Sequence, residues 1–367
     1  MRLAVVLEQC LAPVPGGTGR YSREVAAALA RCASPGDEVS SVVAWHRSTT
    51  AAAVPGVRGP RRLQLPRRAL VAAWERGHGP RVPGDLVLAP TPLFPPAGGA
   101  PCAVVVHDAV PWTHPETLTP RGVAWHRAQV SRAAREAALV VVPTQAVADE
   151  LRRHTPLREL LVVGEGVSGD LALPADADSR ATRLGLPSSY LLTVATLEPR
   201  KGLDVLLSAL ALPAAPDLPL LCVGQPGWGG LDPLALAAAA GLGPDRVRVL
   251  GRVPDADLAV LLDRATALVV PSRAEGFGLP LLEAMAAGTP VVTSDAAALV
   301  EVAGGAARVS ALEPAALAAA LAEVAGDPEL RARMADAGRL RAGHYSWDAA
   351  AGALWSALRD IASRRSA

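Results

Sequence analysis

Two glutamates eight positions apart, Glu275 and Glu283, mark the stretch of this sequence best suited to chemistry. A carboxylate accepts several hydrogen bonds, so either one can hold a vicinal diol of a ribose or a hexose. Between them, the N–H groups of Phe277, Gly278 and Leu279 would point out of a helix N-terminus toward sugar or phosphate oxygens. The stretch therefore predicts a site for a nucleotide sugar. Taken alone, the two carboxylates would equally fit an ordinary strand–loop–helix.

The residues around this stretch predict the elements that position it. The apolar run 267–272 is typical of a buried strand, Gly288 ends a helix, and 290–293 begins another strand. Glu275 would then lie in a loop at the carboxyl end of a strand. Ligands of open α/β sheets bind at this edge.

A second candidate is the pair Arg200 and Lys201, between a predicted strand at 190–196 and a helix at 203–212. Two cations in this position form a candidate clamp for a diphosphate. A basic turn is the alternative. Lys201 is the single lysine among 36 basic residues, and composition alone would have supplied arginine there, which favours a functional role.

The N-terminal half offers two weaker signals. Gly17 belongs to a glycine-rich loop predicted between a strand at 3–7 and a helix, but the spacing is not that of a full dinucleotide fingerprint. His107 follows a predicted strand at 102–106 and would share the sheet edge of Gly17. A plain turn and a satisfied loop histidine are the respective alternatives.

Three strings together resemble the retaining glycosyltransferases of family 4. Residues 275–283 resemble the Glu-x7-Glu signature in its Glu-Gly-Phe-Gly-Leu-Pro form, and residues 198–201 resemble the Glu-Pro-Arg-Lys segment. Residues 107–116 look like the His-Asp-x-x-Pro-x-x-x-Pro-Glu segment of the mannosyltransferase-like branch. The resemblance covers nearly the whole chain. It implies an α/β protein of the GT-B fold, with two Rossmann-like parallel-sheet domains facing across a cleft and a C-terminal helix crossing back to the first domain.

The resemblance also implies a role for each matching residue. Arg200 and Lys201 would neutralise the leaving diphosphate, Glu275 would hold sugar hydroxyls, and His107 would touch the sugar from the first domain. Many members carry an additional arginine where this chain has Thr196 and Leu197. Binding of the donor phosphates is therefore assigned to Arg200 and Lys201. Asp108 and His114 are interpreted as structural. The substrate-binding candidates are Glu283 for the ribose, Val253 beside the base, Gly17 facing the diphosphate and acceptor, and the backbone of Phe277, Gly278 and Leu279.

Alternating strands and helices in two linked halves independently favour two parallel α/β domains. We expect an acceptor-side domain at 1–168, a linker at 169–187, a nucleotide-sugar domain at 188–345 and a helix at 346–367 that packs on the first domain. Residues 51–83 are predicted to be irregular.

Composition limits the function classes. A net charge of +1 gives no reason to expect nucleic-acid binding, and four scattered cysteines favour free thiols in a reducing cytoplasm. The Asp-x-Asp strings at 176–178 and 255–257 do not follow a strand with the surroundings usual for a metal-binding motif, and the resemblance implies a fold class that normally needs no metal, so neither a metal nor a cofactor is expected. The apolar N-terminus is interrupted at Glu8, too early for a signal peptide. The composition, rich in alanine, glycine and arginine, is typical of a bacterial source.

Residues 1–180 carry 20 basic and 16 acidic groups, with seven arginines between 58 and 81. A solvated surface is the simpler interpretation. The alternative is a basic patch for a phosphorylated acceptor or for peripheral contact with the inner face of the plasma membrane.

The predicted function is retaining transfer of a hexose, with mannose as the candidate that the branch suggests, from a nucleotide diphosphate sugar to an acceptor hydroxyl. The acceptor would be a glycan, a lipid-linked sugar or a small molecule. Two other classes stay open: a nucleotide-sugar 2-epimerase of the same architecture, which would need acid/base carboxylates on the first domain, and a catalytically inactive nucleotide-sugar-binding subunit.

Overall fold

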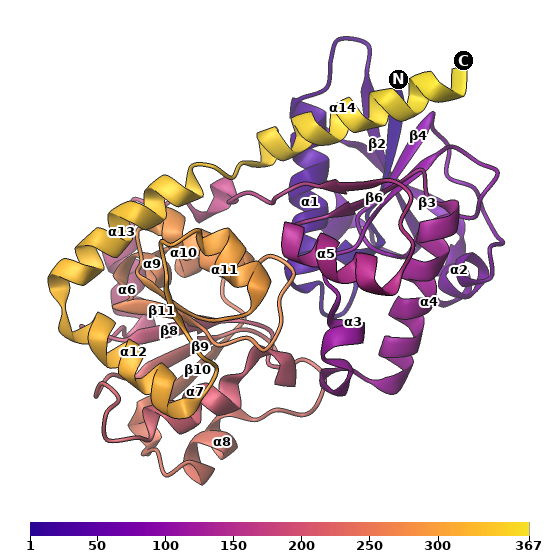
Figure 1. Cartoon of the computed structure of the whole chain (residues 1–367). Helices are drawn as coiled ribbons and strands as arrows, with labels where there is room; N and C mark the ends of the chain where they lie inside the picture. The colour runs from indigo at the N-terminus through magenta and orange to yellow at the C-terminus, as the bar shows by residue number, and fades with distance from the viewer. Residues whose placement is uncertain (367) are drawn as a thin grey trace. The chain divides into compact units, whose positions relative to one another are not determined.

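A computed structural model describes residues 1–366 of the chain, and these fall into two compact units (Figure 1). Unit 1 comprises residues 1–115, 119–166 and the C-terminal segment from 346, and unit 2 comprises residues 116–118 and 167–345. Residue 367, the end of the predicted C-terminal helix segment, lies outside the described residues. Each unit is an α/β sandwich built on one parallel sheet, and the predicted fold class is therefore confirmed.

Unit 1 contains a seven-stranded parallel sheet in the order β3-β2-β1-β4-β5-β6-β7. Strands β1, β4, β5 and β6 of this sheet are short and apolar because both of their faces are covered, as expected for parallel sheets. The strands are β1 (Arg2–Val6), β2 (Glu38–Trp45), β3 (Arg58–Pro66), β4 (Leu86–Ala89), β5 (Cys102–Val105), β6 (Leu139–Val142) and β7 (Leu160–Val162). The helices are α1 (Gly16–Arg31), α2 (Arg67–Glu75), α3 (Val110–Thr113), α4 (Pro120–Glu136), α5 (Gln145–His154) and α14 (Trp347–Ser366).

Helix α14 packs along α1 within unit 1 (Figure 1). Ser346 caps it as predicted, accepting a bond from the Ala349 N–H at 3.1 Å. Trp355 is fully buried, and its indole N–H donates to the Leu29 carbonyl at 3.0 Å. The apolar stripe of this helix is therefore part of the core of unit 1.

Unit 2 contains a six-stranded parallel sheet in the order β10-β9-β8-β11-β12-β13. The strands are β8 (Leu191–Val194), β9 (Leu220–Val223), β10 (Val247–Gly251), β11 (Ala267–Val270), β12 (Val291–Ser294) and β13 (Arg308–Ser310). The helices are α6 (Ala177–Leu184), α7 (Leu203–Leu210), α8 (Pro233–Ala239), α9 (Asp255–Arg264), α10 (Leu279–Ala287), α11 (Ala297–Ala303), α12 (Pro314–Gly326) and α13 (Pro328–Ala342).

Two segments differ from their predicted form. Residues 51–83, predicted as irregular, contain β3 and α2, because β3 is an edge strand whose exposed arginines hide the usual apolar alternation. Residues 169–187, predicted as a linker, contain α6, whose Ala181 is buried and which packs on α9. Both elements bury few side chains, so their sequences lack the apolar pattern from which a strand or a helix is predicted.

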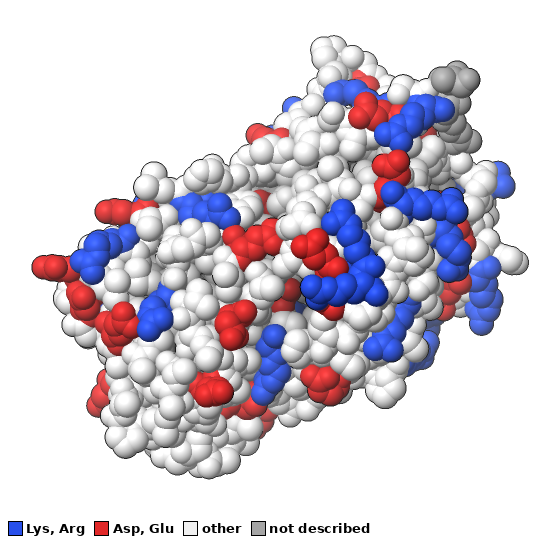
Figure 2. Space-filling model, viewed as in Figure 1, with Lys and Arg blue, Asp and Glu red and all other residues white. Residues whose placement is uncertain are grey.

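The arginine-rich segment is partly satisfied by protein groups. Arg58 pairs with Glu38, Arg62 donates to two backbone carbonyls, Arg67 pairs with Glu8, and Arg76 donates to Ala72. On the face drawn in Figure 2, basic side chains stand among acidic ones. None of the helices within residues 1–366 has the length and apolar character needed to span a membrane.

Candidate functional site

The predicted Arg200–Lys201 pair and Glu275 lie on neighbouring strands of unit 2. Arg200 and Lys201 form a single 3₁₀ turn after β8, and Glu275 lies in the loop between β11 and α10. Strands β8 and β11 are adjacent at the centre of the sheet. The strands that follow β8 are added on one side of this pair, and the strands that follow β11 are added on the other side. This is the topological switch point of the sheet, where the loops separate and leave room for a ligand.

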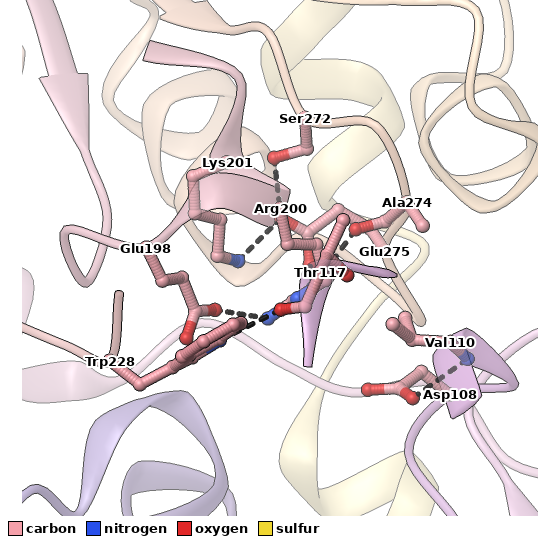
Figure 3. A network of polar contacts seen from close by, with 10 residues as sticks. All are labelled: Asp108, Val110, Thr117, Glu198, Arg200, Lys201, Trp228, Ser272, Ala274 and Glu275. Atoms are coloured by element: carbon pink, nitrogen blue, oxygen red, sulfur yellow. Dashed lines mark hydrogen bonds and ion pairs between the residues drawn. The ribbon is translucent and has the colours of Figure 1, made fainter. Parts of the chain in front are cut away.

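At this point four charged side chains form one cluster (Figure 3). Lys201 Nζ lies 2.6 Å from Glu275 Oε1, and Arg200 Nη1 lies 2.9 Å from Glu275 Oε2. Arg200 also reaches Glu198 at 2.8 Å, and the Ser272 hydroxyl donates to Glu275 at 2.7 Å. Each of the four charged side chains is less than a fifth exposed. The cluster combines two cations with two carboxylates and is therefore close to neutral.

The backbone around the cluster explains two glycines. Gly202 has φ +65°, and a Cβ there would stand 1.9 Å from the Pro271 carbonyl oxygen, so the two loops meet without room for a side chain. Gly278, at φ +94°, precedes α10, and a Cβ there would collide with Leu299 at 2.5 Å. Arg273 then ties the loops together, with bonds to Asp204 and to the Pro199 carbonyl.

Electrostatics hold Glu275 ionised. Burial alone would raise the pKa of Glu275, but Lys201 and Arg200, with the hydrogen bonds from Lys201 and Ser272, lower it to about 2. A carboxylate with this pKa is charged throughout the physiological range and cannot serve as a proton-transferring group. Lys201 Nζ uses one of its three donors on Glu275, and within the described residues no other acceptor for it is seen.

The remaining predicted residues of unit 2 surround the same loop or lie further along the sheet edge. Glu283 is buried on α10, which begins just after the Glu275 loop. Phe277 is buried with its ring edge against Tyr345, at a centroid distance of 5.4 Å. The first intrahelical acceptor of α10 is the Gly278 carbonyl, so the N–H groups of Phe277, Gly278 and Leu279 precede the helical bonds. Val253 follows β10, the edge strand, two strands away from β8.

In unit 1, His107 is half-buried and follows β5, and protein groups face both of its ring nitrogens. Nε2 lies 2.8 Å from the Pro90 carbonyl oxygen, which only accepts, so Nε2 carries the proton. Nδ1 lies 3.8 Å from the carboxylate of Glu165, which is buried. Tyr21 packs its ring against His107 at 4.7 Å.

This environment favours the imidazolium form of His107. Burial lowers its pKa, but the Glu165 carboxylate, the Pro90 carbonyl and Asp108 raise it, and the net direction is upward. A histidine protonated on both nitrogens has no lone pair to accept a proton. Among the groups that raise the pKa of His107, Glu165 contributes most.

The sequence did not indicate Glu165, Glu198 or Ser272. Asp108, the sequence neighbour of His107, accepts instead from the Val110 N–H at 3.1 Å, as a structural residue would. Glu165 lies 58 positions after His107, so the spacing carried no signal. Glu198 belongs to the Glu-Pro-Arg-Lys string, and this membership was the one sequence feature that connected it with Arg200 and Lys201.

The glycine-rich stretch differs from its prediction as well. Gly16 to Gly19 form the first turn of α1 instead of a loop before it. Gly17 is exposed, and a Cβ there would meet nothing within 4 Å. Packing around the missing side chain therefore does not explain the glycine at this position.

The Asp-x-Asp strings join two helices of unit 2. Asp178 pairs with Arg264 of α9, while Asp257 of α9 pairs with Arg180 and Arg183 of α6. These ion pairs account for the aspartates as structural residues.

Comparisons with known proteins agree with this geometry. The family model "Glycosyl transferases group 1" matches residues 175–341. D-inositol 3-phosphate glycosyltransferase of Streptomyces avermitilis is 39% identical over 232 residues, which is 58% of this chain and 50% of that protein. O-antigen chain mannosyltransferase B of Escherichia coli is 43% identical over 124 residues, covering 33% and 32% of the two chains. The chain thus spans at most about half the length of these curated relatives.

Among solved structures, HepE of Anabaena in complex with UDP-glucose has a TM-score of 0.72 and 20% identity, over 100% of this chain and 99% of that one. At this identity the likeness concerns the fold. The expected resemblance to these glycosyltransferases is confirmed for residues 175–341, and the likeness of fold to the GT-B proteins extends over the whole chain.

We predict a pH-dependent stability contribution from Glu275. Because its pKa is lowered, its ion pairs stabilise the protein fully above the ordinary carboxyl pKa of 4.5 and progressively less as the pH falls toward about 2. Glu275→Gln should therefore unfold more easily than the native protein at neutral pH, and the difference should shrink between pH 4.5 and 2. Urea unfolding across this range measures it. Glu329→Gln, whose side chain is 92% exposed, is the control, and a difference independent of pH would refute the ion-pair account.

A second prediction concerns Glu165. Removing its charge by Glu165→Gln should lower the pKa of His107, because the carboxylate favours the imidazolium. In the native protein the contact stabilises unit 1 below the ordinary histidine pKa of 6.5 and is lost as the pH rises through the raised value. NMR titration of the His107 ring protons measures the change. Asp108→Asn should have the smaller effect, and equal shifts in the two variants would contradict the pairing.

Proposed function

We propose, from the premise that residues 175–341 belong to the group 1 glycosyltransferases, that this protein is a retaining hexosyltransferase that uses a nucleotide diphosphate sugar. The observation that carries the proposal is the position of Arg200 and Lys201, which lie together and half-buried at the switch point of the unit 2 sheet. A diphosphate placed there would receive charge-assisted hydrogen bonds from both side chains.

In the proposed reaction, the bond between the anomeric carbon and the diphosphate oxygen breaks, and an acceptor oxygen forms the new bond. Negative charge grows on the leaving phosphate, and Lys201 and Arg200 stabilise it. The leaving phosphate itself takes the acceptor proton on the same face of the sugar. This route needs no enzymic base, which agrees with an ionised Glu275 of very low pKa and with a His107 whose ring nitrogens are both engaged.

The donor sugar and base are part of the proposal. HepE was solved with UDP-glucose, and one relative is a mannosyltransferase, so both support a hexose nucleotide as donor. We favour mannose because residues 107–116 carry the mannosyltransferase-like string. Glu283, buried on the helix that follows the cluster, is assigned to the ribose diol, and Glu275 to the hydroxyls of the hexose.

The alternatives fit less well. An epimerase would need carboxylates in unit 1 that exchange protons, whereas Glu165 lies against His107 and Asp108 accepts from the backbone. A subunit that only binds the nucleotide sugar would not need the Arg200–Lys201 pair to stabilise a leaving diphosphate. Measuring hydrolysis of the donor without an acceptor separates the transferase from a purely binding protein.

Lys201→Ala and Glu283→Ala should each weaken binding of the nucleoside diphosphate by about 1.5–3 kcal/mol, the cost of one charge-assisted contact. Calorimetry measures this, with the nucleotide first identified by a thermal-shift screen. Arg308→Ala is a matched control, since Arg308 forms a surface pair with Glu323 outside the cluster. Unchanged affinity in both site variants would remove the clamp assignment.

The stereochemical outcome tests the mechanism. We expect an α-linked product from an α-configured donor, and His107→Ala should be slowed but still active, because the histidine is not the base. The anomeric proton coupling of the purified product reports the linkage. A β-linked product would overturn the front-face route, even if the nucleotide affinities behave as predicted.

A further inference from the structure

The turn that precedes α10 has only one side chain that can fix its conformation. In the sequence Gly276-Phe277-Gly278 that side chain is Phe277, and Gly278 has the left-handed conformation, with φ +94°. Glycines on both sides of Phe277 give the backbone access to many conformations unless a contact selects one. The N–H groups of this turn are candidates for binding the donor sugar, so their preorganisation depends on how Phe277 is anchored.

The ring of Phe277 is anchored on Tyr345. The two rings meet edge to face, with centroids 5.4 Å apart and planes at 85°, and Phe277 is 4% exposed. This geometry stabilises an aromatic pair beyond the apolar area that it buries. Tyr345 is itself fixed to the end of α13, because its N–H donates to the Ala342 carbonyl at 2.9 Å. The turn is thereby attached to a second helix of unit 2.

Arg341 connects Tyr345 with α11. Its Nη2 donates to the Tyr345 hydroxyl at 2.9 Å and to the Glu301 carbonyl at 2.7 Å. Its Nε donates to the Val302 carbonyl at 2.9 Å, and its Cζ lies 5.0 Å from the centroid of the Tyr345 ring. A cation that donates to the last carbonyls of a helix stabilises the C-terminus of that helix. The orientation of Tyr345 is therefore tied to the end of α11.

Helix α11 also supports the turn directly. Leu299 occupies the space that a side chain of Gly278 would need, since a Cβ there would stand 2.5 Å from Leu299 Cδ2. At the end of α11, Gly304 has φ +54°, and a Cβ there would collide with the Arg341 guanidinium. Helix α10 packs on both α11 and α13 (Figure 1). The turn thus has two supports, the aromatic contact and α11, and Arg341 donates to both.

We propose that Tyr345, oriented by Arg341, is a positioning residue that keeps the Phe277 turn in the conformation required for binding the donor sugar. This proposal rests on the proposed function. Hydrogen bonds weaken steeply as their angle departs from linear, so a displaced turn would lose its bonds to the sugar. The diphosphate is assigned to Arg200 and Lys201, which follow a different strand, β8. Loosening the turn should therefore affect the sugar and spare the diphosphate.

The test compares binding of a nucleotide sugar with binding of its nucleoside diphosphate. Calorimetry on the full chain would use GDP-mannose beside GDP and UDP-glucose beside UDP. Tyr345→Ala should weaken binding of the nucleotide sugar about tenfold, the loss of one or two hydrogen bonds, and binding of the nucleoside diphosphate less than about twofold. Tyr345→Phe retains the ring but lacks the hydroxyl that accepts from Arg341, so its loss should be intermediate.

Tyr190→Phe is the matched control. Tyr190 is another buried tyrosine of unit 2, and its hydroxyl donates to the Leu261 carbonyl of α9 at 2.8 Å. This variant should lose stability and keep the native ratio of the two affinities. Equal weakening of both ligands by Tyr345→Ala, or native affinity for both, would overturn the proposal, because a residue with a purely structural role does not distinguish the two ligands.

A second pair of variants serves if Tyr345→Ala does not fold. Phe277→Leu removes the aromatic contact from its other partner, and Tyr345→Leu keeps apolar bulk at the end of α13. Each should lower the affinity for the nucleotide sugar relative to that for the nucleoside diphosphate. Because both remove the same contact, the double variant should be no worse than the more affected single variant. Additive losses would contradict a positioning role that acts through this contact.

Binding by the native chain separates this inference from the proposed function. If the native chain binds neither GDP-mannose nor UDP-glucose, the donor site assigned to unit 2 fails, and the positioning role fails with it. If the native chain binds one of them and the Tyr345 variants keep its ratio of affinities, the positioning role alone is wrong.

Discussion

Glu275 held between Lys201 and Arg200 is the interaction on which the site in unit 2 depends. The three side chains come from two loops that follow adjacent strands, β8 and β11, and the ion pairs hold these loops together. Each buried charge would be costly alone, and each is tolerated because the others compensate it. The close approach also explains Gly202, since the Pro271 carbonyl occupies the space of its absent side chain. Backbone conformation, charge balance and site position are thus consequences of one arrangement.

Each of the two parallel sheets has a switch point at which a ligand could bind. A switch point leaves a gap between loops that diverge from two neighbouring strands, and both units have one. Unit 2 fills its gap with paired charges on short loops. Unit 1 instead leaves a hollow at its switch point, whose lining residues Glu8 and Glu75 accept hydrogen bonds from other parts of the unit. The same architecture therefore leaves two differently built gaps, a nearly neutral cluster of charges in unit 2 and an open hollow in unit 1.

The sequence was sufficient for the parts of the fold that have strong local signals. The apolar strands, the Gly288 end of α10 and the cap of α14 follow directly from residue type and spacing. The same signals placed Arg200, Lys201 and Glu275 in loops that follow strands, and the strand order of the folded sheet makes these loops neighbours. Elements with little buried surface were missed: β3 presents arginines at a sheet edge, and α6 buries only Ala181. Glu165 was missed because its contact with His107 is made by the tertiary fold, and no local pattern encodes that contact.

The neutral charge of the cluster has a consequence for how a donor would bind. A diphosphate adds negative charge to a group in which two cations already face two carboxylates, so simple addition would leave the site with excess negative charge. The cations must then divide their hydrogen bonds between the phosphates and Glu275. Glu275, released from part of its pairing, gains lone pairs that can accept from sugar hydroxyls. The ion pairs of Glu275 and its proposed sugar-binding role are therefore two uses of one carboxylate, and Lys201 links them because its ammonium can turn its donors from one acceptor to the other.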